Sequence, residues 1–110
     1  QEKSYMEVTD CVRAMFHLVM TEESPLNYFN LGSGDTCSVS RIAEIVVGAS
    51  NLENVEIKYT GGERGWAGDV SKAMLSTTRL NSTGFKSNYT SEEAVLHTAQ
   101  CLMKELRLHE

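Results

Sequence analysis

Short extended segments that alternate with amphipathic helical repeats constrain the fold of this 110-residue chain more than any other feature. We expect extended segments over residues 3–8, 28–31 and 55–59, the last of which alternates apolar and polar residues. A helix with Thr9 as its N-cap should follow the first segment, and a helix capped by Ser38 should follow the second. This order of strand, helix, strand, helix and strand is typical of a mixed α/β fold with a short, mainly parallel sheet and several helices.

Each of the three long helical segments has apolar residues at steps of three and four, the spacing of a single helical face. We expect these three faces to be buried. They comprise, in order along the chain, Cys11, Val12, Met15, Phe16, Val19 and Met20; Val39, Ile42, Ala43, Val46 and Val47; and Ala94, Val95, Thr98, Leu102, Met103 and Leu106. The first helix should end near Thr21, and Thr90 with Glu93 has the spacing of a capping box that opens the last helix. Short helices are expected near residues 71–74 and 77–81.

Composition limits the class of protein. A hydrophobic fraction of 41% and a charged fraction of 23% are ordinary for one small globular domain, residues 1–110. No apolar run approaches the roughly 20 residues that cross a bilayer, so we expect no membrane partner. A net charge of −5 without a basic stripe disfavours nucleic-acid binding. Three scattered cysteines without a C-x-x-C pair favour reduced thiols and a cytoplasmic setting. Because the chain starts at Gln1 without a signal peptide, we expect an excised part of a larger protein.

The glycine-rich loop TGGERGWAGD at residues 60–69 has the most distinctive chemistry. Four glycines surround Arg64 and Trp66, and the loop ends on Asp69. Glycines allow the backbone to approach a ligand closely, and the arginine fork matches phosphate oxygens. A carboxylate accepts hydrogen bonds from ribose hydroxyls. The loop is therefore either a diphosphate-and-ribose clamp or a plain surface loop with a solvated arginine, and the residue types alone favour the plain loop.

Several other chemistries are not indicated. Gly62, Gly65 and Gly68 have the spacing of a dinucleotide fingerprint, but no long helix and second strand are expected after them, so we reject that interpretation. The three histidines lack partners at metal-ligand spacing, and no metal site is expected. No tyrosine has a lysine four residues further on, so an acid/base pair of that kind on one helix face is missing. The sequence thus predicts no catalytic residue and no cofactor-binding residue in this chain.

Three stretches together resemble a known family. They are KSYMEVTDCVRAM at residues 3–15, FNLGSGDTCSVSRIAEIV at residues 29–46 and YTGGERGWAGDVSKAMLSTTRLNSTGF at residues 59–85. With the closing EEAVLHTAQCL helix, they resemble the extended short-chain dehydrogenase/reductase family, in its nucleotide-sugar epimerase and dehydratase branch. The resemblance covers nearly the whole chain in the family's order, and the R-G-W-x-G-D loop is its most specific element. Within the branch the chain looks most like the UDP-glucose 4-epimerase type.

The resemblance implies a single carboxy-terminal, substrate-binding domain, a fragment of a larger two-domain enzyme. In such enzymes the domain normally packs on a Rossmann domain, which holds NAD and a tyrosine–lysine catalytic pair. This chain would bind a UDP-sugar or a related nucleotide-sugar and would be inactive alone, and NAD would be bound only by the missing domain. Its partners would be the nucleotide-sugar and the Rossmann domain of the same parent chain, and enzymes of this family often form homodimers.

The resemblance also implies roles for individual residues and reverses the preference for the plain loop. Arg64 would hold the diphosphate, Asp69 a ribose hydroxyl, and Trp66 would shape the pocket wall. Lys3 stands where the family often has an arginine, and a lysine contacts phosphate as a point charge without the bidentate fork. Glu7 stands where a histidine or tyrosine is common, and we assign it no role.

Two alternatives stay open. The parent enzyme could be a nucleotide-sugar 4,6-dehydratase, decarboxylase or reductase of the same family, since these differ mainly in residues of the missing half. A second alternative is a stand-alone binding or scaffold module that kept the fold without catalysis.

Overall fold

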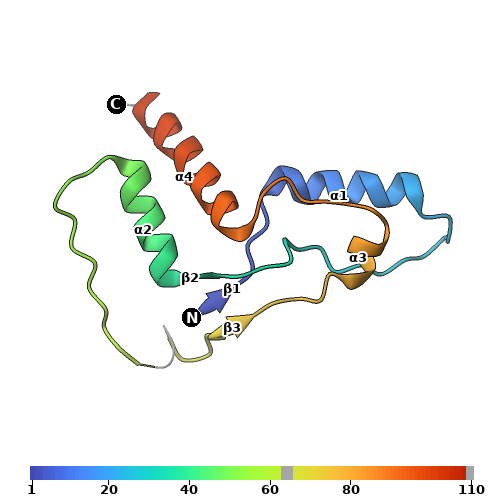
Figure 1. Cartoon of the computed structure of the whole chain (residues 1–110), viewed down its shortest axis with the longest axis horizontal. Helices are drawn as coiled ribbons and strands as arrows, with labels where there is room; N and C mark the ends of the chain where they lie inside the picture. The colour runs from blue at the N-terminus through green and yellow to red at the C-terminus, as the bar shows by residue number, and fades with distance from the viewer. Residues whose placement is uncertain (63–65, 109–110) are drawn as a thin grey trace.

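The computed structural model describes residues 1–62 and 66–108. Two of the four helices, α2 and α4, pack side by side at one end, whereas α1 and α3 lie at the other, with a small sheet between the two groups (Figure 1). The helices are α1 (Val8–Thr21), α2 (Val39–Ser50), α3 (Thr78–Ser82) and α4 (Ser91–Leu108). The expected mixed α/β class is therefore confirmed.

The sheet has three strands of two residues each: β1 (Glu2–Lys3), β2 (Cys37–Ser38) and β3 (Lys72–Ala73). Its order is β2-β1-β3, with β1 antiparallel to β2 and parallel to β3. The register pairs are Glu2 with Ser38, Lys3 with Cys37, Glu2 with Lys72 and Lys3 with Ala73. The central strand β1 therefore joins the first residues of the chain to a segment about seventy positions away, and one of its two pairings is parallel.

Three expectations about local structure are wrong. Residues 28–31 and 55–59 are not strands, and residues 72–73 form strand β3 where a short helix was expected. The alternation in 55–59 does not produce a strand because no segment among the described residues pairs with it, and most of its side chains are exposed. The expected helix near 77–81 is present as α3.

The N-cap of helix α1 lies two residues earlier than expected. The N-cap is Glu7, whose carboxylate accepts hydrogen bonds from the backbone N–H of Thr9 at 2.8 Å and of Asp10 at 3.2 Å, and from the Thr9 hydroxyl. The prediction that Thr9 caps the helix is thus wrong. A carboxylate at the N-cap satisfies free N–H groups and places negative charge at the positive end of the helix dipole.

The starts of α2 and α4 agree with the expectations. The Ser38 side chain caps α2 by accepting a hydrogen bond from the Arg41 N–H at 3.1 Å. Thr90 and Glu93 form the reciprocal capping box before α4, each side chain accepting from the other's N–H at 3.2 Å. Helix α2 ends at Ser50 and is followed by the C-cap Asn51, which adopts the left-handed conformation common after helices.

The core is small and lies in two places. Ala14, Leu80 and Phe85 are buried together, and Met6, Leu18 and Leu31 pack against them. Between α2 and α4, Ile45, Ala94 and Ala99 are buried. The first of these clusters fixes α1 and α3 relative to each other, and the second fixes α2 and α4.

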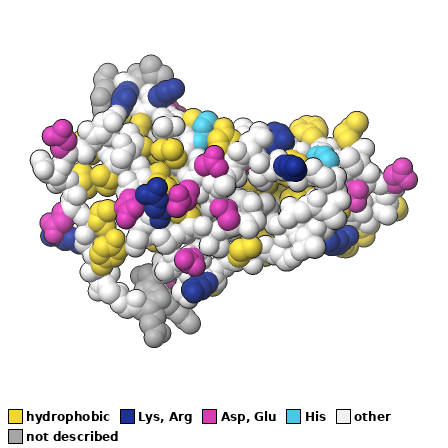
Figure 2. Space-filling view, in the orientation of Figure 1, with side chains coloured by type: hydrophobic (Ala, Val, Ile, Leu, Met, Phe, Trp, Pro, Cys, Tyr) yellow, Lys and Arg dark blue, Asp and Glu magenta, His cyan; other side chains and the backbone are white. Residues whose placement is uncertain are grey.

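The predicted burial of the three apolar helical faces is largely wrong for the part of the chain that the structure describes. Of the residues predicted to be buried on α2 and α4, Ala94 is buried, whereas Val39, Val46, Leu102 and Leu106 are exposed. The apolar face of α1 departs furthest from the prediction. Five of its six residues are exposed, from 44% for Val12 to 82% for Met20. Hydrophobic side chains are visible on the surface along this side of the molecule (Figure 2). The face is amphipathic as the spacing predicts, but the described residues do not cover it. None of the described helices combines the length and apolarity that a membrane span needs.

Candidate functional site

The sheet brings Lys3 and Asp69, which are 66 residues apart, into contact. The Lys3 Nζ lies 2.8 Å from Asp69 Oδ1, and the side chain of Asp69 is only 10% exposed. The Glu2 N–H donates to the Ser71 carbonyl at 2.8 Å, so the parallel pairing of β1 with β3 holds the two segments in this position. Two of the four predicted site residues are therefore neighbours.

Gln1 is a third member of this cluster that the sequence analysis did not identify. Its Nε2 donates to Asp69 Oδ2 at 2.5 Å, so each oxygen of the carboxylate accepts at least one hydrogen bond. No sequence signal could have indicated Gln1, because its role follows only from the pairing of β1 with β3.

The electrostatics of the pair favour a permanent charge on Lys3. Its hydrogen bond to Asp69 is the largest influence and raises the pKa of Lys3 above its ordinary value, against a smaller opposing effect of burial. The ammonium group therefore stays protonated at neutral pH and can neutralise an anion at this edge of the sheet. The net charge of the chain is −5, so such a local cation matters for any phosphate ligand.

Trp66 and Asp69 share one tight turn. The Asp69 N–H donates to the Trp66 carbonyl at 3.0 Å, and Gly68 within the turn has φ of 99°. A Cβ placed on Gly68 would lie 3.1 Å from Cζ3 of Trp66, so the indole rests against the glycine backbone. Trp66 is nevertheless 69% exposed, and much of its surface faces solvent. Arg64, the fourth predicted site residue, lies outside the described residues.

A buried hydroxyl network supports the segment that follows β1. The Ser91 hydroxyl accepts from the Tyr5 N–H at 2.9 Å and lies 2.9 Å from Ser33 Oγ. The Ser33 hydroxyl in turn lies 3.1 Å from Ser4 Oγ, and the Ser91 N–H donates to Asp35 at 2.9 Å. Ser33 and Asp35 belong to the FNLGSGD segment at residues 29–35. The network ties the residues next to Lys3 to the start of α4.

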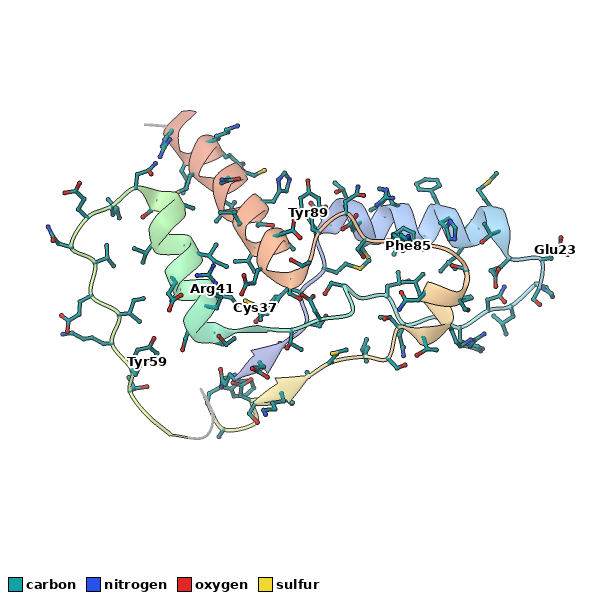
Figure 3. All side chains as sticks on the ribbon, in the orientation of Figure 1. Glu23, Cys37, Arg41, Tyr59, Phe85 and Tyr89 are labelled. Carbon is teal, nitrogen blue, oxygen red and sulfur yellow. The ribbon has the colours of Figure 1, made fainter. Side chains whose placement is uncertain are left out.

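Among the thiol and imidazole side chains, Cys37 is paired with Lys3 across β1 and β2, whereas His97 and Cys101 lie on α4. Burial raises the pKa of Cys37, which keeps that thiol neutral at the junction of β2 and α2 (Figure 3). On α4, Cys101 Sγ lies 3.7 Å from His97 Nε2, and the ring centroid of Tyr89 lies 4.9 Å from that of His97. No group of three or more metal-ligating side chains occurs within residues 1–62 and 66–108.

Comparison with solved structures shows the class of this fold, an epimerase-like α/β fragment. One matching solved structure is described as the crystal structure of UDP-galactose 4-epimerase, with a TM-score of 0.82 and 35% sequence identity. The match covers 96% of this chain and 35% of that chain, so our chain spans about a third of the length of its structural neighbour. No family model and no curated protein match the chain.

Proposed function

We propose that this chain is the nucleotide-sugar-binding portion of an NAD-dependent epimerase of the UDP-glucose 4-epimerase type. The observation that supports this most directly is the contact of Lys3 with Asp69 beside Trp66, in a fold similar to that of UDP-galactose 4-epimerase. A cation, a carboxylate and an exposed aromatic ring at one sheet edge match the phosphate, ribose and ring surfaces of a nucleotide.

In this proposal each side chain holds a different part of the ligand. The Lys3 ammonium neutralises a diphosphate oxygen as a point charge, and Arg64 adds a planar fork for the same group. The Asp69 carboxylate accepts a hydrogen bond from a ribose hydroxyl. Such a grip holds the nucleotide and leaves the hexose free to turn, which an epimerase needs because the sugar must present both faces to one cofactor.

The remaining steps of the reaction belong to the rest of the parent protein. NAD accepts and returns hydride when it is bound, and the residues of this chain do not fit it, because no dinucleotide fingerprint opens a long helix here. In our proposal a Rossmann domain of the same parent chain supplies the NAD site and the tyrosine–lysine pair, so this chain alone is inactive. We further propose a cytoplasmic setting and a homodimeric parent enzyme.

Other reactions of the same family would use the same grip. A 4,6-dehydratase, a decarboxylase or a reductase would differ mainly in residues outside this chain, and a stand-alone scaffold module would share its fold. The exposed apolar face of α1 favours the two-domain enzyme over the stand-alone module, because a module that acts alone has no reason to expose it.

The test is a titration of the isotope-labelled chain with UDP-glucose and, separately, with NAD, followed through backbone amide shifts. We expect UDP-glucose to shift the amides of residues 61–69 and of Lys3, and NAD to shift none of them. Asp69→Asn should reduce these shifts, whereas Glu44→Gln should not, since Glu44 lies in an exposed ion pair on α2. Equal responses of both variants would contradict the proposal.

A kinetic test uses the complete parent enzyme. Arg64→Ala should raise KM for the nucleotide-sugar about tenfold or more, because it removes a charged contact with the diphosphate. Unchanged kinetics in this variant would exclude a role of Arg64 in the grip.

A further inference from the structure

The indole of Trp66 is the largest exposed ring next to the candidate site. Single exposed hydrophobic side chains are common on protein surfaces and need no explanation by themselves. Trp66 differs because a contact with the backbone limits where its ring can lie. The side chain rests against the backbone of Gly68, where even a methyl group would approach Cζ3 to 3.1 Å, and yet 69% of the residue is exposed.

The same turn fixes the position of the Asp69 carboxylate relative to this ring. The hydrogen bond from the Asp69 N–H to the Trp66 carbonyl closes the turn at 3.0 Å. Lys3 and Gln1 donate hydrogen bonds to the two carboxylate oxygens, at 2.8 Å and 2.5 Å. The turn therefore holds the Trp66 ring and the Asp69 carboxylate close together at the edge of the sheet.

We propose that Trp66 stacks on the base of the bound nucleotide. This inference rests on the proposed function, in which Asp69 binds the ribose. The base is bonded directly to the ribose, whereas the hexose is separated from it by two phosphates. A ring beside the ribose-binding carboxylate is therefore closer to the base than to the hexose. Stacking uses the π-face that every base has, so Trp66 contributes affinity without selecting one base.

The chain offers a clean spectroscopic probe, because Trp66 is its single tryptophan. We would titrate the chain with UMP and, separately, with glucose 1-phosphate, and follow its intrinsic fluorescence. Stacking on a base changes the emission of an indole directly. We expect saturable quenching by UMP and none by glucose 1-phosphate at equal concentration.

Substitutions separate stacking from a purely structural role. Trp66→Phe retains an aromatic face and should keep UMP affinity within about threefold, while Trp66→Leu should weaken UMP about tenfold, as expected for loss of one base–aromatic stack. Affinity in these variants is measured from amide shifts of Lys3 and Asp69, which also report whether the turn is still folded. Tyr28→Leu is the matched control, because Tyr28 is similarly exposed, at 71%, on the segment after α1 (Figure 1).

Each outcome has a distinct meaning. Equal UMP affinity of Trp66→Leu and the unmodified chain would overturn stacking and leave the nucleotide grip intact. Quenching by glucose 1-phosphate without quenching by UMP would assign the ring to the sugar and also overturn the inference. Absence of any shift at Lys3 and Asp69 with both UMP and UDP-glucose would refute the proposed function itself.

Discussion

Glu7 illustrates how one side chain takes a structural role that its sequence position did not suggest. It is buried, it caps α1, and its hydrogen bond with the Thr9 hydroxyl is the largest of several effects that lower the pKa of Glu7 below its ordinary value. Burial opposes this shift but does not reverse it. The ionised form of Glu7 is therefore the form that stabilises the folded chain.

The sign of the resulting pH dependence follows from linkage. A carboxyl whose pKa is lowered by folding contributes stability above its unfolded pKa, here 4.5, and that contribution is lost as the pH falls through the folded value. We expect Glu7→Gln to lower the melting temperature at neutral pH, and this difference to shrink in acid below pH 4.5. Thermal unfolding followed by circular dichroism measures both. Glu44→Gln serves as the surface control, and a constant difference across the whole range would contradict the assignment.

Lys3 offers a second test at the residue scale. An arginine there can contact Asp69 and a phosphate through separate nitrogens of one planar group, whereas lysine offers a single charged nitrogen. We expect Lys3→Arg to tighten UDP binding about threefold and Lys3→Met to weaken it about tenfold, as for gain or loss of a charge-assisted contact. Calorimetric titration with UDP measures these changes. A Lys3→Met chain that binds UDP as tightly as the unmodified chain would exclude Lys3 from the grip.

At the scale of elements, a buried carboxylate ties α1 to the segment that leads into α4. Asp10 is fully buried and accepts hydrogen bonds from the backbone N–H groups of Asn88 and Tyr89, both at 3.0 Å. Arg13 donates to the same carboxylate at 2.7 Å. The segment before α4 crosses the start of α1 near Tyr89 (Figure 3). The hydrogen bonds of Asp10 therefore hold the segment before the last helix against the start of α1.

We expect Asp10→Asn to destabilise the chain by about 2 kcal/mol, because an amide has only one acceptor oxygen and leaves a buried N–H group without a partner. Chemical denaturation measures the loss. Asn88→Ala is the matched control and should be nearly neutral, since Asp10 binds the backbone of Asn88. If both variants lose equal stability, the backbone contacts are not the cause.

At the scale of the whole molecule, the exposed face of α1 is the main unexplained feature. Val12, Phe16 and Met20 line an open hollow together with Phe85. Apolar surface of this kind marks a contact with another protein surface. The chain spans 35% of its structural neighbour, and we propose that the Rossmann domain of the same parent chain covers this face.

This proposal predicts the behaviour of the isolated chain. We expect the 110-residue chain to self-associate and to bind a hydrophobic dye, because the face is uncovered. Val19→Glu combined with Met20→Gln should reduce both effects and leave the melting temperature of the chain unchanged, since both side chains are exposed. Sedimentation velocity measures the association. The same pair of substitutions should destabilise the complete enzyme, and an unaffected complete enzyme would show that α1 contacts no other domain.

The sequence by itself determined the elements whose signals are local. The presence of α1 and α2, the end of α1 at Thr21, the Ser38 cap and the capping box of Thr90 with Glu93 depend on residues within a few positions of one another, so spacing and residue type suffice. The glycine-rich loop was also recognisable, because its residue types are unusual. The resemblance then pointed to Lys3 and Asp69 as members of one site.

Only the tertiary structure decided how these parts meet. Strands of two residues have no periodicity to detect, and their identity depends on pairing between segments far apart, as with Lys3 and Ala73. The ion pair of Lys3 with Asp69 and the contribution of Gln1 follow from that pairing. Whether the apolar face of α1 is buried depends on which surfaces lie against it, and helical spacing contains no information about a partner. Local chemistry therefore determined the helices, and long-range backbone pairing determined the site.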